Sequence, residues 1–347
     1  MSHGVGIIGA GPGVAALHAP TIARLGGAFQ VVHVSDSGSG RAETIALRTG
    51  ARWSSGIDDL LADREVDVVV VCSPPAEHAR HVLAAVAAGK RAIFCEKPIA
   101  TTEADAIAVI EACRAARVPL IVGTNHLFDG AWGRARHHLT ATGGPVRAIA
   151  VTMVLPPNGR YHQVVTELAS VAAPARDGGP DLGEPAVAAS VVRQLLTGLA
   201  VHDLPLLRDL APDFERVVYA RAVAPIGYAV GYEASGVPIR LATVMVPDGP
   251  DALWRLEITT DDERIDVSFP PAFVHAGSAS VQVRYADDRL IVYPQEPDNG
   301  YVAEWRALVH AMRGEVEIEY DELLADARYA LSLADAASAV ILEGGRR

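Results

Sequence analysis

Short apolar runs alternate with segments of helical periodicity over the first third of the chain. Strands are predicted at residues 4–9, 30–35, 66–72, 91–95 and 119–123, with a weaker one near 51–53. Between them, apolar side chains recur at helical spacing over residues 13–25, 41–49, 76–88 and 103–116. This alternation is typical of βαβ units, so we predict a doubly wound parallel sheet of the Rossmann type.

The pattern changes after residue 123. A helix is predicted at 132–141, a strand at 146–155 and a long helical stretch at 185–210. Six more strands are predicted at 216–224, 239–246, 254–259, 264–269, 280–285 and 289–293, and helices close the chain at 301–313 and 320–342. We predict two domains: an α/β domain over 1–124, and an α+β domain with a mostly antiparallel open sheet over 125–347. A surface loop is expected at 172–185.

The charge, the lengths of the apolar stretches and the cysteine spacing bear on whether the protein binds nucleic acid, a membrane or a metal. The formal net charge is −12 and the 30 basic residues are scattered, so nucleic acid is not an expected partner. No apolar stretch approaches the roughly 20 residues that a membrane span requires, and the start does not look like a secretory signal. Cys72, Cys95 and Cys113 lack metal-ligand spacing and are interpreted as reduced core residues. We expect a cytoplasmic protein with neither a metal site nor a membrane partner.

The first predicted strand leads into the segment Gly-Ala-Gly-Pro-Gly-Val at residues 9–14. Glycine at positions 9 and 11 allows a tight turn and a close approach of a pyrophosphate, whose charge the amide groups of the following helix favour. Val14 stands where the usual fingerprint has its third glycine. We predict that Gly9, Gly11, Pro12, Gly13 and Val14 bind the phosphates of a dinucleotide. A plain strand–helix turn is the alternative.

An acidic residue ends the second predicted strand, about 25 residues after the glycine turn. Asp36 is placed to accept both ribose hydroxyls of NAD, and it would repel the 2′-phosphate of NADP. The neighbouring Ser37 is predicted to lie in the same site, and Arg41 offers a cation that would accommodate NADP. We therefore expect NAD and keep NADP open. A helix-capping or turn role for Asp36 is the alternative interpretation.

Further segments at strand ends suggest a family. They are Cys-Ser-Pro-Pro-Ala-Glu-His at 72–78, Cys-Glu-Lys-Pro-Ile-Ala at 95–100 and Gly-Thr-Asn-His-Leu-Phe-Asp at 123–129, with His-Ala-Pro at 18–20 after the glycine turn. In residues and spacing, the whole first domain resembles the Gfo/Idh/MocA family of NAD(P)-dependent oxidoreductases, and the second domain resembles it in the order of elements. The resemblance implies a cofactor site that includes Cys72, Ser73, Pro74, His78, Glu96, Lys97 and Asn125.

Lys97 is one of only two lysines in the chain, the other being Lys90. Pro98 fixes its own backbone and favours an extended neighbour, which directs the Lys97 side chain. The resemblance implies that this lysine orients the substrate hydroxyl and shares its proton, while Glu96 balances its charge. A surface ion pair between Glu96 and Lys97 is the alternative.

The family also carries an Asp four residues before a His in its second domain. Here His202 stands at the histidine position, whereas Gly198 replaces the Asp and Pro205 replaces an acid often found three residues after the His. We predict that His202 is a general acid or base, with a buried or capping histidine as the alternative. Adjacent helical residues point about 100° apart, so Asp203 is not expected to replace the lost acid.

Tyr161 and His162 lie in a predicted polar loop and are a further candidate for the missing proton donor, although the polarity of a loop explains them equally well. The histidines show no third ligand at metal-binding spacing, which argues against a metal.

The resemblance implies hydride transfer between NAD(P) and a secondary alcohol or ketone of a sugar, cyclitol or similar polyol, by a homodimer or homotetramer. Two other classes remain open because Gly198 interrupts the family motif. One is a dinucleotide-binding regulatory protein without turnover, and the other is a non-redox enzyme that uses tightly bound NAD transiently. Retention of Lys97 argues against the regulatory class.

Overall fold

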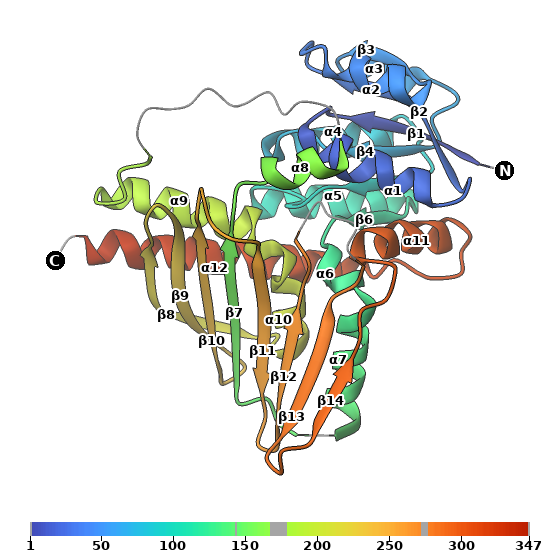
Figure 1. Ribbon diagram of the computed structural model, residues 1–347. Coiled ribbons are helices and arrows are strands. Elements are labelled where there is room, and N and C mark those ends of the chain that lie inside the picture. The colour runs from blue at the N-terminus through green and yellow to red at the C-terminus, as the bar shows by residue number, and fades with distance from the viewer. Residues whose placement is uncertain (1, 143, 167–178, 272–276, 346–347) are drawn as a thin grey trace. The chain divides into compact units, whose positions relative to one another are not determined.

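The computed structural model describes residues 2–142, 144–166, 179–271 and 277–345. The chain divides into two compact units (Figure 1). Unit 1 consists of Met1–Thr124, His162–Ser170 and Tyr301–Arg328, and unit 2 consists of Asn125–Tyr161, Val171–Gly300 and Tyr329–Arg347. Unit 1 therefore contains the predicted first domain together with segments from much later in the chain.

Unit 1 is built on a six-stranded, all-parallel sheet with the order β3-β2-β1-β4-β5-β6. The strands are β1 (His3–Ile8), β2 (Phe29–Asp36), β3 (Arg52–Ser55), β4 (Val68–Val71), β5 (Ala92–Cys95) and β6 (Leu120–Val122). The helices are the π-helical turn η1 (Val14–His18), α1 (Ala19–Arg24), α2 (Arg41–Thr49), α3 (Asp58–Ala62), α4 (Pro75–Ala87) and α5 (Glu103–Ala116). The strand order reverses between β1 and β4, and ligands of open α/β sheets bind beyond the carboxyl ends of the strands at such a point.

The central strands of unit 1 are buried on both faces. All four residues of β4 are valine and all are inaccessible to solvent, as expected for a parallel strand that helices cover on each side. One face packs against α4 and α5. A late helix, α11 (Gly300–Met312), contributes Trp305, which stacks on Phe94 of β5 with ring centroids 5.1 Å apart and meets Phe29 edge-on at 5.0 Å. The long helix α12 (Tyr320–Gly344) begins in unit 1 and continues in unit 2.

Unit 2 is built on an eight-stranded sheet with the order β14-β13-β12-β11-β7-β10-β9-β8. Its strands are β7 (Ala148–Leu155), β8 (Phe214–Ala222), β9 (Ile226–Ala234), β10 (Val237–Met245), β11 (Leu253–Thr259), β12 (Glu263–Ser268), β13 (Ser280–Tyr285) and β14 (Leu290–Tyr293). Every pair is antiparallel except β7 with β10. The predicted fold class, a parallel Rossmann sheet followed by an α+β unit with a mostly antiparallel sheet, is confirmed.

One face of this second sheet is covered by helices. Burial alternates along β10, so that Ile239 and Leu241 lie in the core while Arg240 and Ala242 are exposed. The core also receives apolar side chains from α12 and from the helices α7 (Gly130–Thr142), α9 (Pro185–Gly198) and α10 (Leu204–Leu210). Figure 1 shows these helices together with the long strands β7–β14.

Several details differ from the sequence prediction. The helical stretch predicted as one piece at 185–210 forms α9, a 3₁₀ turn η2 (Ala200–His202) and α10, because Pro205 in the first turn of α10 has no amide to continue the preceding helix. Strand β9 was not predicted, since Gly227 and Gly231 weaken its apolar signal. Two short helices, α3 and α6 (Asn125–Phe128), were also missed, and the segment around Tyr161 is helix α8 (Gly159–Val165) rather than a loop. Residues 172–178 of the predicted loop at 172–185 lie outside the described residues, and Pro185 at its end already belongs to α9.

Within the described residues, no helix is both long enough and apolar enough to cross a membrane.

Truncating a core residue of the unit 2 sheet should lower the stability of the protein. Leu256 of β11 is completely buried, so Leu256→Ala is expected to cost about 2–5 kcal/mol in the free energy of unfolding. Val218 of β8 is 52% exposed, and Val218→Ala should change it by less than about 0.5 kcal/mol. Thermal and urea unfolding followed by circular dichroism measure both variants. Equal losses in the two variants would contradict this assignment of the core face.

Candidate functional site

The bend after β1 is a backbone-to-backbone contact that only glycine permits. Gly9 has a φ of 102°, and a Cβ built on it would lie 2.5 Å from the carbonyl oxygen of Cys72 at the end of β4. A Cβ on Gly11, by contrast, would meet nothing within 4 Å. Gly9 is therefore needed for the fold of the loop, whereas Gly11 leaves open space in front of the helix that begins at Val14. A pyrophosphate needs that space, so these residues fit a dinucleotide.

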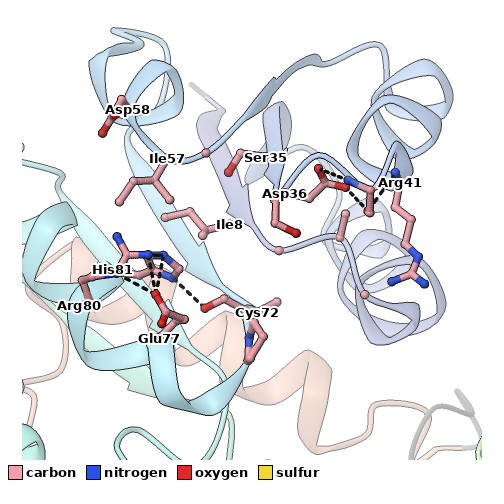
Figure 2. A pocket seen from close by; sticks show the side chains of 18 residues that line it. Ile8, Ser35, Asp36, Arg41, Ile57, Asp58, Cys72, Glu77, Arg80 and His81 are labelled. Atoms are coloured by element: carbon pink, nitrogen blue, oxygen red, sulfur yellow. Dashed lines mark hydrogen bonds and ion pairs between the residues drawn. The ribbon is translucent and has the colours of Figure 1, made fainter. Parts of the chain in front are cut away.

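A pocket of about 720 Å³ opens at this bend, entirely within unit 1 (Figure 2). Its volume is within the range of small-molecule and cofactor sites. The loops after β1, β2, β3 and β4 and the start of α4 line it, through Ile8, Gly9, Ala10, Gly11, Ser35, Asp36, Ser37, Ser39, Arg41, Gly56, Ile57, Asp58, Cys72, Ser73, Pro74, Glu77, Arg80 and His81.

Asp36 lies on one wall of the pocket, with Arg41 on the same side (Figure 2). Its carboxylate accepts hydrogen bonds from the backbone amide of Gly38 at 2.7 Å and from that of Ala42, in the first turn of α2, at 3.1 Å. The Ser39 hydroxyl and amide donate to it as well. Partial burial raises the pKa of Asp36, but these hydrogen bonds outweigh it and lower the pKa. Asp36 therefore carries the negative charge expected of a ribose-binding residue and also holds its own loop in place.

The opposite wall contains three residues of α4 that the sequence analysis did not assign to the cofactor. Glu77, Arg80 and His81 lie together on it (Figure 2). The Arg80 guanidinium donates to Glu77 at 2.8 Å, and His81 Nδ1 lies 2.8 Å from the hydroxyl of Ser73. Burial and the neighbouring Arg80 charge lower the pKa of His81. The sequence contains a signal that could have identified them. Positions 77, 80 and 81 follow the Ser-Pro-Pro segment at helical spacing, which brings them to one side of the first turns of the helix.

Lys97 lies at the carboxyl end of β5, next to the strand whose end lines the pocket. Val71 of β4 pairs with Cys95 of β5, and the Glu96 amide donates to the Val71 carbonyl at 2.9 Å. The turn that follows contains a cis Lys97–Pro98 peptide bond. His78 fixes this turn, because its two ring nitrogens lie 2.7 Å from the carbonyl oxygens of Pro98 and Ser73.

The environment of Lys97 favours a neutral amine more than water does. Burial lowers the pKa of Lys97, and the adjacent Glu96 carboxylate opposes that change without cancelling it. An amine whose pKa moves toward neutrality is better suited to take up and return a proton than an exposed lysine.

Unit 2 holds a second buried group of polar side chains around His202. Asp203 accepts hydrogen bonds from His126 Nδ1 at 2.9 Å and from the indole nitrogen of Trp254 at 2.9 Å. The His126 ring lies 5.5 Å from the His202 ring, and Trp254 lies edge-on to His202, also at 5.5 Å. His126 also stacks on Phe269 at 3.7 Å. The Asp203 carboxylate is therefore engaged by His126 and Trp254. It fixes the two rings that contact His202.

The pocket brings together eight of the predicted cofactor residues, namely Gly9, Gly11, Asp36, Ser37, Arg41, Cys72, Ser73 and Pro74. It does not include six other predicted residues of unit 1, which are Pro12, Gly13, Val14, His78, Glu96 and Lys97. Val14 is buried at the start of η1, with 1% of its surface exposed. Asn125 and His202 belong to unit 2, where both are buried. The Asn125 side-chain oxygen makes no hydrogen bond to any residue that the structure describes.

The hydroxyl of Tyr161 makes two hydrogen bonds within unit 2. Its hydroxyl donates to Asp251 at 2.6 Å and accepts from the amide of Ala252 at 2.8 Å. Burial and the Asp251 carboxylate raise the pKa of Tyr161. The hydroxyl thus has a structural role that the sequence did not reveal. His162 is buried in α8, and burial lowers its pKa.

The fold and the pocket define the class of protein, an oxidoreductase with a dinucleotide-binding Rossmann unit. Residues 3–124 match the Gfo/Idh/MocA family model, described as oxidoreductase family, NAD-binding Rossmann fold. Inositol 2-dehydrogenase 2 from Saccharopolyspora erythraea is 31% identical over 279 residues, which are 80% of this chain and 68% of that protein. The chain therefore belongs to the Gfo/Idh/MocA family of oxidoreductases, and the predicted family and the predicted NAD(P) cofactor are confirmed.

Other matches are shorter or more distant. Inositol 2-dehydrogenase 3 from the same organism is 37% identical over 145 residues, and this match spans only 42% of either protein. A crystal structure of a 3-ketoreductase from Actinomadura kijaniata, in complex with NADP and TDP-benzene, aligns with a TM-score of 0.75 over 97% of this chain and 98% of that one. The two share 19% sequence identity, so this likeness shows the fold.

Replacing Gly9 and Gly11 with alanine should have two different effects, the first on the stability of the protein and the second on dinucleotide binding. Gly9→Ala is expected to lower the unfolding temperature, because its Cβ would collide with the Cys72 carbonyl. Gly11→Ala should leave the unfolding temperature close to that of the wild type and weaken dinucleotide binding by about tenfold or more, since its Cβ would occupy space in the pocket. Differential scanning calorimetry and titration calorimetry separate the two effects. A Gly11→Ala protein that binds NAD normally would show that the pyrophosphate lies elsewhere.

Proposed function

We propose that the protein transfers a hydride between NAD(P) and a secondary alcohol or ketone of a sugar, cyclitol or similar polyol. The relatives named inositol 2-dehydrogenase support a polyol, and the solved 3-ketoreductase supports chemistry at a sugar ketone. We further propose that it works as a homodimer or homotetramer, as the family resemblance implies.

The observation that carries this proposal is the position of Lys97. The dinucleotide pocket and the Lys97 turn lie at the same edge of one sheet, at the ends of the neighbouring strands β4 and β5. The two ring nitrogens of His78 lie 2.7 Å from the carbonyl oxygens of Pro98 and Ser73. Ser73 itself lines the pocket. The backbone turn that carries Lys97 is therefore fixed next to the end of the pocket that Cys72 and Ser73 form.

The chain supplies the proton transfer and the orientation of the substrate. When bound, the nicotinamide accepts or donates the hydride. During alcohol oxidation the neutral Lys97 amine accepts the hydroxyl proton of the substrate, and during ketone reduction its ammonium returns a proton to the carbonyl oxygen. Burial lowers the pKa of Lys97 and so makes it easier for the ammonium to release its proton.

His202 is proposed as a second group that exchanges a proton with the substrate. Its ring is 5% exposed and is packed between His126 and Trp254, both held by Asp203. A ring with so little freedom presents its nitrogens in a constant direction, which general acid–base catalysis requires. This packing supplies an orientation that the Asp missing at Gly198 would otherwise provide.

The second candidate function is a dinucleotide-binding regulatory protein without turnover. Gly198 favours it, because the residue that usually pairs with the catalytic histidine is absent from this chain. A panel of cyclitols, polyols and ketosugars separates the two functions. The proposed enzyme changes the absorbance of the reduced nicotinamide with at least one member of the panel, whereas a regulatory protein binds the cofactor without turnover.

Lys97 should be essential for turnover and dispensable for binding the cofactor. Lys97→Met removes the amine and is expected to lower kcat about 10²–10⁴-fold. Lys97→Arg keeps a positive charge, but arginine does not release its proton near neutral pH, so this variant should lower kcat to a similar extent. Titration calorimetry should give both variants an NAD affinity within a few-fold of the wild type. An active Lys97→Arg enzyme would show that the charge, and not proton transfer, is required.

Asp36 and Arg41 should have opposite effects on the choice of cofactor. Asp36→Ala is expected to weaken NAD binding relative to NADP binding by about tenfold, since it removes an acceptor for the ribose hydroxyls and a repulsion toward the 2′-phosphate. Arg41→Ala should weaken NADP relative to NAD. The ratio of the two dissociation constants in each variant is the measurement. An unchanged ratio in Asp36→Ala would remove Asp36 from the ribose site.

A further inference from the structure

A cluster of buried and half-buried ionisable side chains lies in unit 1 beside Lys97, and the site described so far gives most of its members no role. It gathers residues from four parts of the chain. They are His18 at the end of η1, Cys72 after β4, Glu96 after β5, and Tyr301 and Glu304 on α11.

His18 and Glu96 form an ion pair inside this cluster. The His18 Nε2 lies 2.8 Å from Glu96 Oε1, and the His18 side chain is 2% exposed. Burial alone favours the neutral imidazole, but the Cys72 sulfur and the Glu96 carboxylate outweigh it and raise the pKa of His18. Burial also raises the pKa of the Cys72 thiol, and the neighbouring His18 opposes that rise. Glu96 makes the 2.8 Å contact with the His18 ring and is the carboxylate that favours its charged form.

Glu304 brings a second carboxyl group close to Glu96. It is completely buried, and its carboxyl oxygens make no hydrogen bond within the part of the chain that the structure describes. Burial and the negative charge of Glu96 raise the pKa of Glu304 well above its ordinary value. A completely buried carboxyl group next to a carboxylate favours its neutral form, and of the two Glu96 is the one stabilised as an anion by His18 and by the amide of Lys97 at 3.2 Å. Glu304 therefore carries a proton.

The packing of the adjacent aromatic residue keeps this arrangement rigid. Trp305 follows Glu304 on α11, and its ring stacks on Phe94 of β5 and meets His18 edge-on at 6.3 Å. On the other side of Glu96, a Cβ on Gly123 would lie 3.2 Å from the Glu96 carboxyl carbon. The Glu96 side chain is thus confined between β6, η1 and α11.

The environment of the remaining ionisable groups around Glu96 favours their neutral forms. Burial raises the pKa of Tyr301 and of Cys95 well above their ordinary values, as it does for Glu304. The charge of Glu96 is balanced by that of His18, so the variable charge of the cluster belongs to Lys97.

We propose that His18 is a positioning residue that neutralises Glu96 and so favours proton exchange at the Lys97 amine during the reaction, with Glu304 as an uncharged member of the same cluster. This inference rests on the proposed function of Lys97. Without the imidazolium, the bare Glu96 carboxylate would stabilise the Lys97 ammonium and hold its proton.

The small number of lysines makes the proposal measurable without a substrate. Protein labelled with ¹³C at the lysine Cε position should give two signals, and Lys90→Arg assigns them. In His18→Gln, whose amide still donates to Glu96 but carries no charge, the titration midpoint of Lys97 should rise by about one pH unit or more. Lys90, whose ammonium donates to the carbonyls of Asp63 and Val66, should not move and serves as the internal reference.

Glu304→Gln is the matched variant. The amide replaces a carboxyl group that already carries a proton, so the Lys97 midpoint should stay within a few tenths of a pH unit of the wild-type value. A lower midpoint in this variant would mean that Glu304 is ionised, which contradicts the proposal. An unchanged midpoint in a folded His18→Gln protein would overturn it as well.

Two further measurements complete the test. In the wild type, the His18 ring signal should stay in its protonated form from pH 6 to pH 8, and a titration near 6.5 would overturn the proposal even if His18→Gln does not fold. With an active substrate, the acid limb of alcohol oxidation should move to higher pH in His18→Gln. If no substrate is turned over, the proposed function fails, whereas the lysine and histidine titrations still decide the charge state of the cluster.

Discussion

The close approach of the β1 loop to the end of β4 is the constraint on which the site depends. Gly9 lies against the Cys72 carbonyl at a distance that excludes any side chain, and this contact sets the opening of the pocket between the first and fourth strands. The same strand ends position the residues that follow. The His78 ring lies 2.7 Å from the carbonyl oxygens of both Ser73 and Pro98, and it therefore connects the backbone turn of Lys97 to a strand end that lines the pocket.

Electrostatics explains why so many ionisable groups are buried around one lysine. A lone carboxylate next to Lys97 would bind the proton that the reaction must move. Burial favours the neutral amine of Lys97, and in our proposal the ion pair of His18 with Glu96 weakens the opposing effect of the carboxylate. The cost of burying a charged pair is offset by the hydrogen bonds that Glu96 accepts from the His18 ring and from the amide of Lys97.

The sequence predicted the elements whose signals are local. Alternating apolar runs gave the parallel sheet, and the glycine bend, Asp36 and the Glu-Lys-Pro turn marked its carboxyl edge. Glu77, Arg80 and His81 were missed because polar residues in the first turns of a helix look like ordinary surface positions. The broken helix around His202 was missed although Pro205 indicated it, because the apolar periodicity of the stretch was followed instead.

Residues from distant segments could not be assigned from the sequence. Glu304 and Trp305 lie more than 200 residues after Glu96 and Phe94, and a glutamate in an amphipathic helix is normally expected on the solvent side. The contact of His126 and Trp254 with Asp203 likewise joins three separate elements of unit 2. Such contacts depend on how the elements pack, which the periodicity of one segment does not contain.

The central claim is that the glycine bend and the pocket beside it bind a pyridine dinucleotide. Isothermal titration calorimetry of the folded wild-type protein with NAD and with NADP tests it most directly. The account predicts saturable heat with one site per chain for at least one of the two cofactors, and tighter binding of NAD. The absence of binding heat with both cofactors, on protein whose fold is verified by circular dichroism, would contradict it.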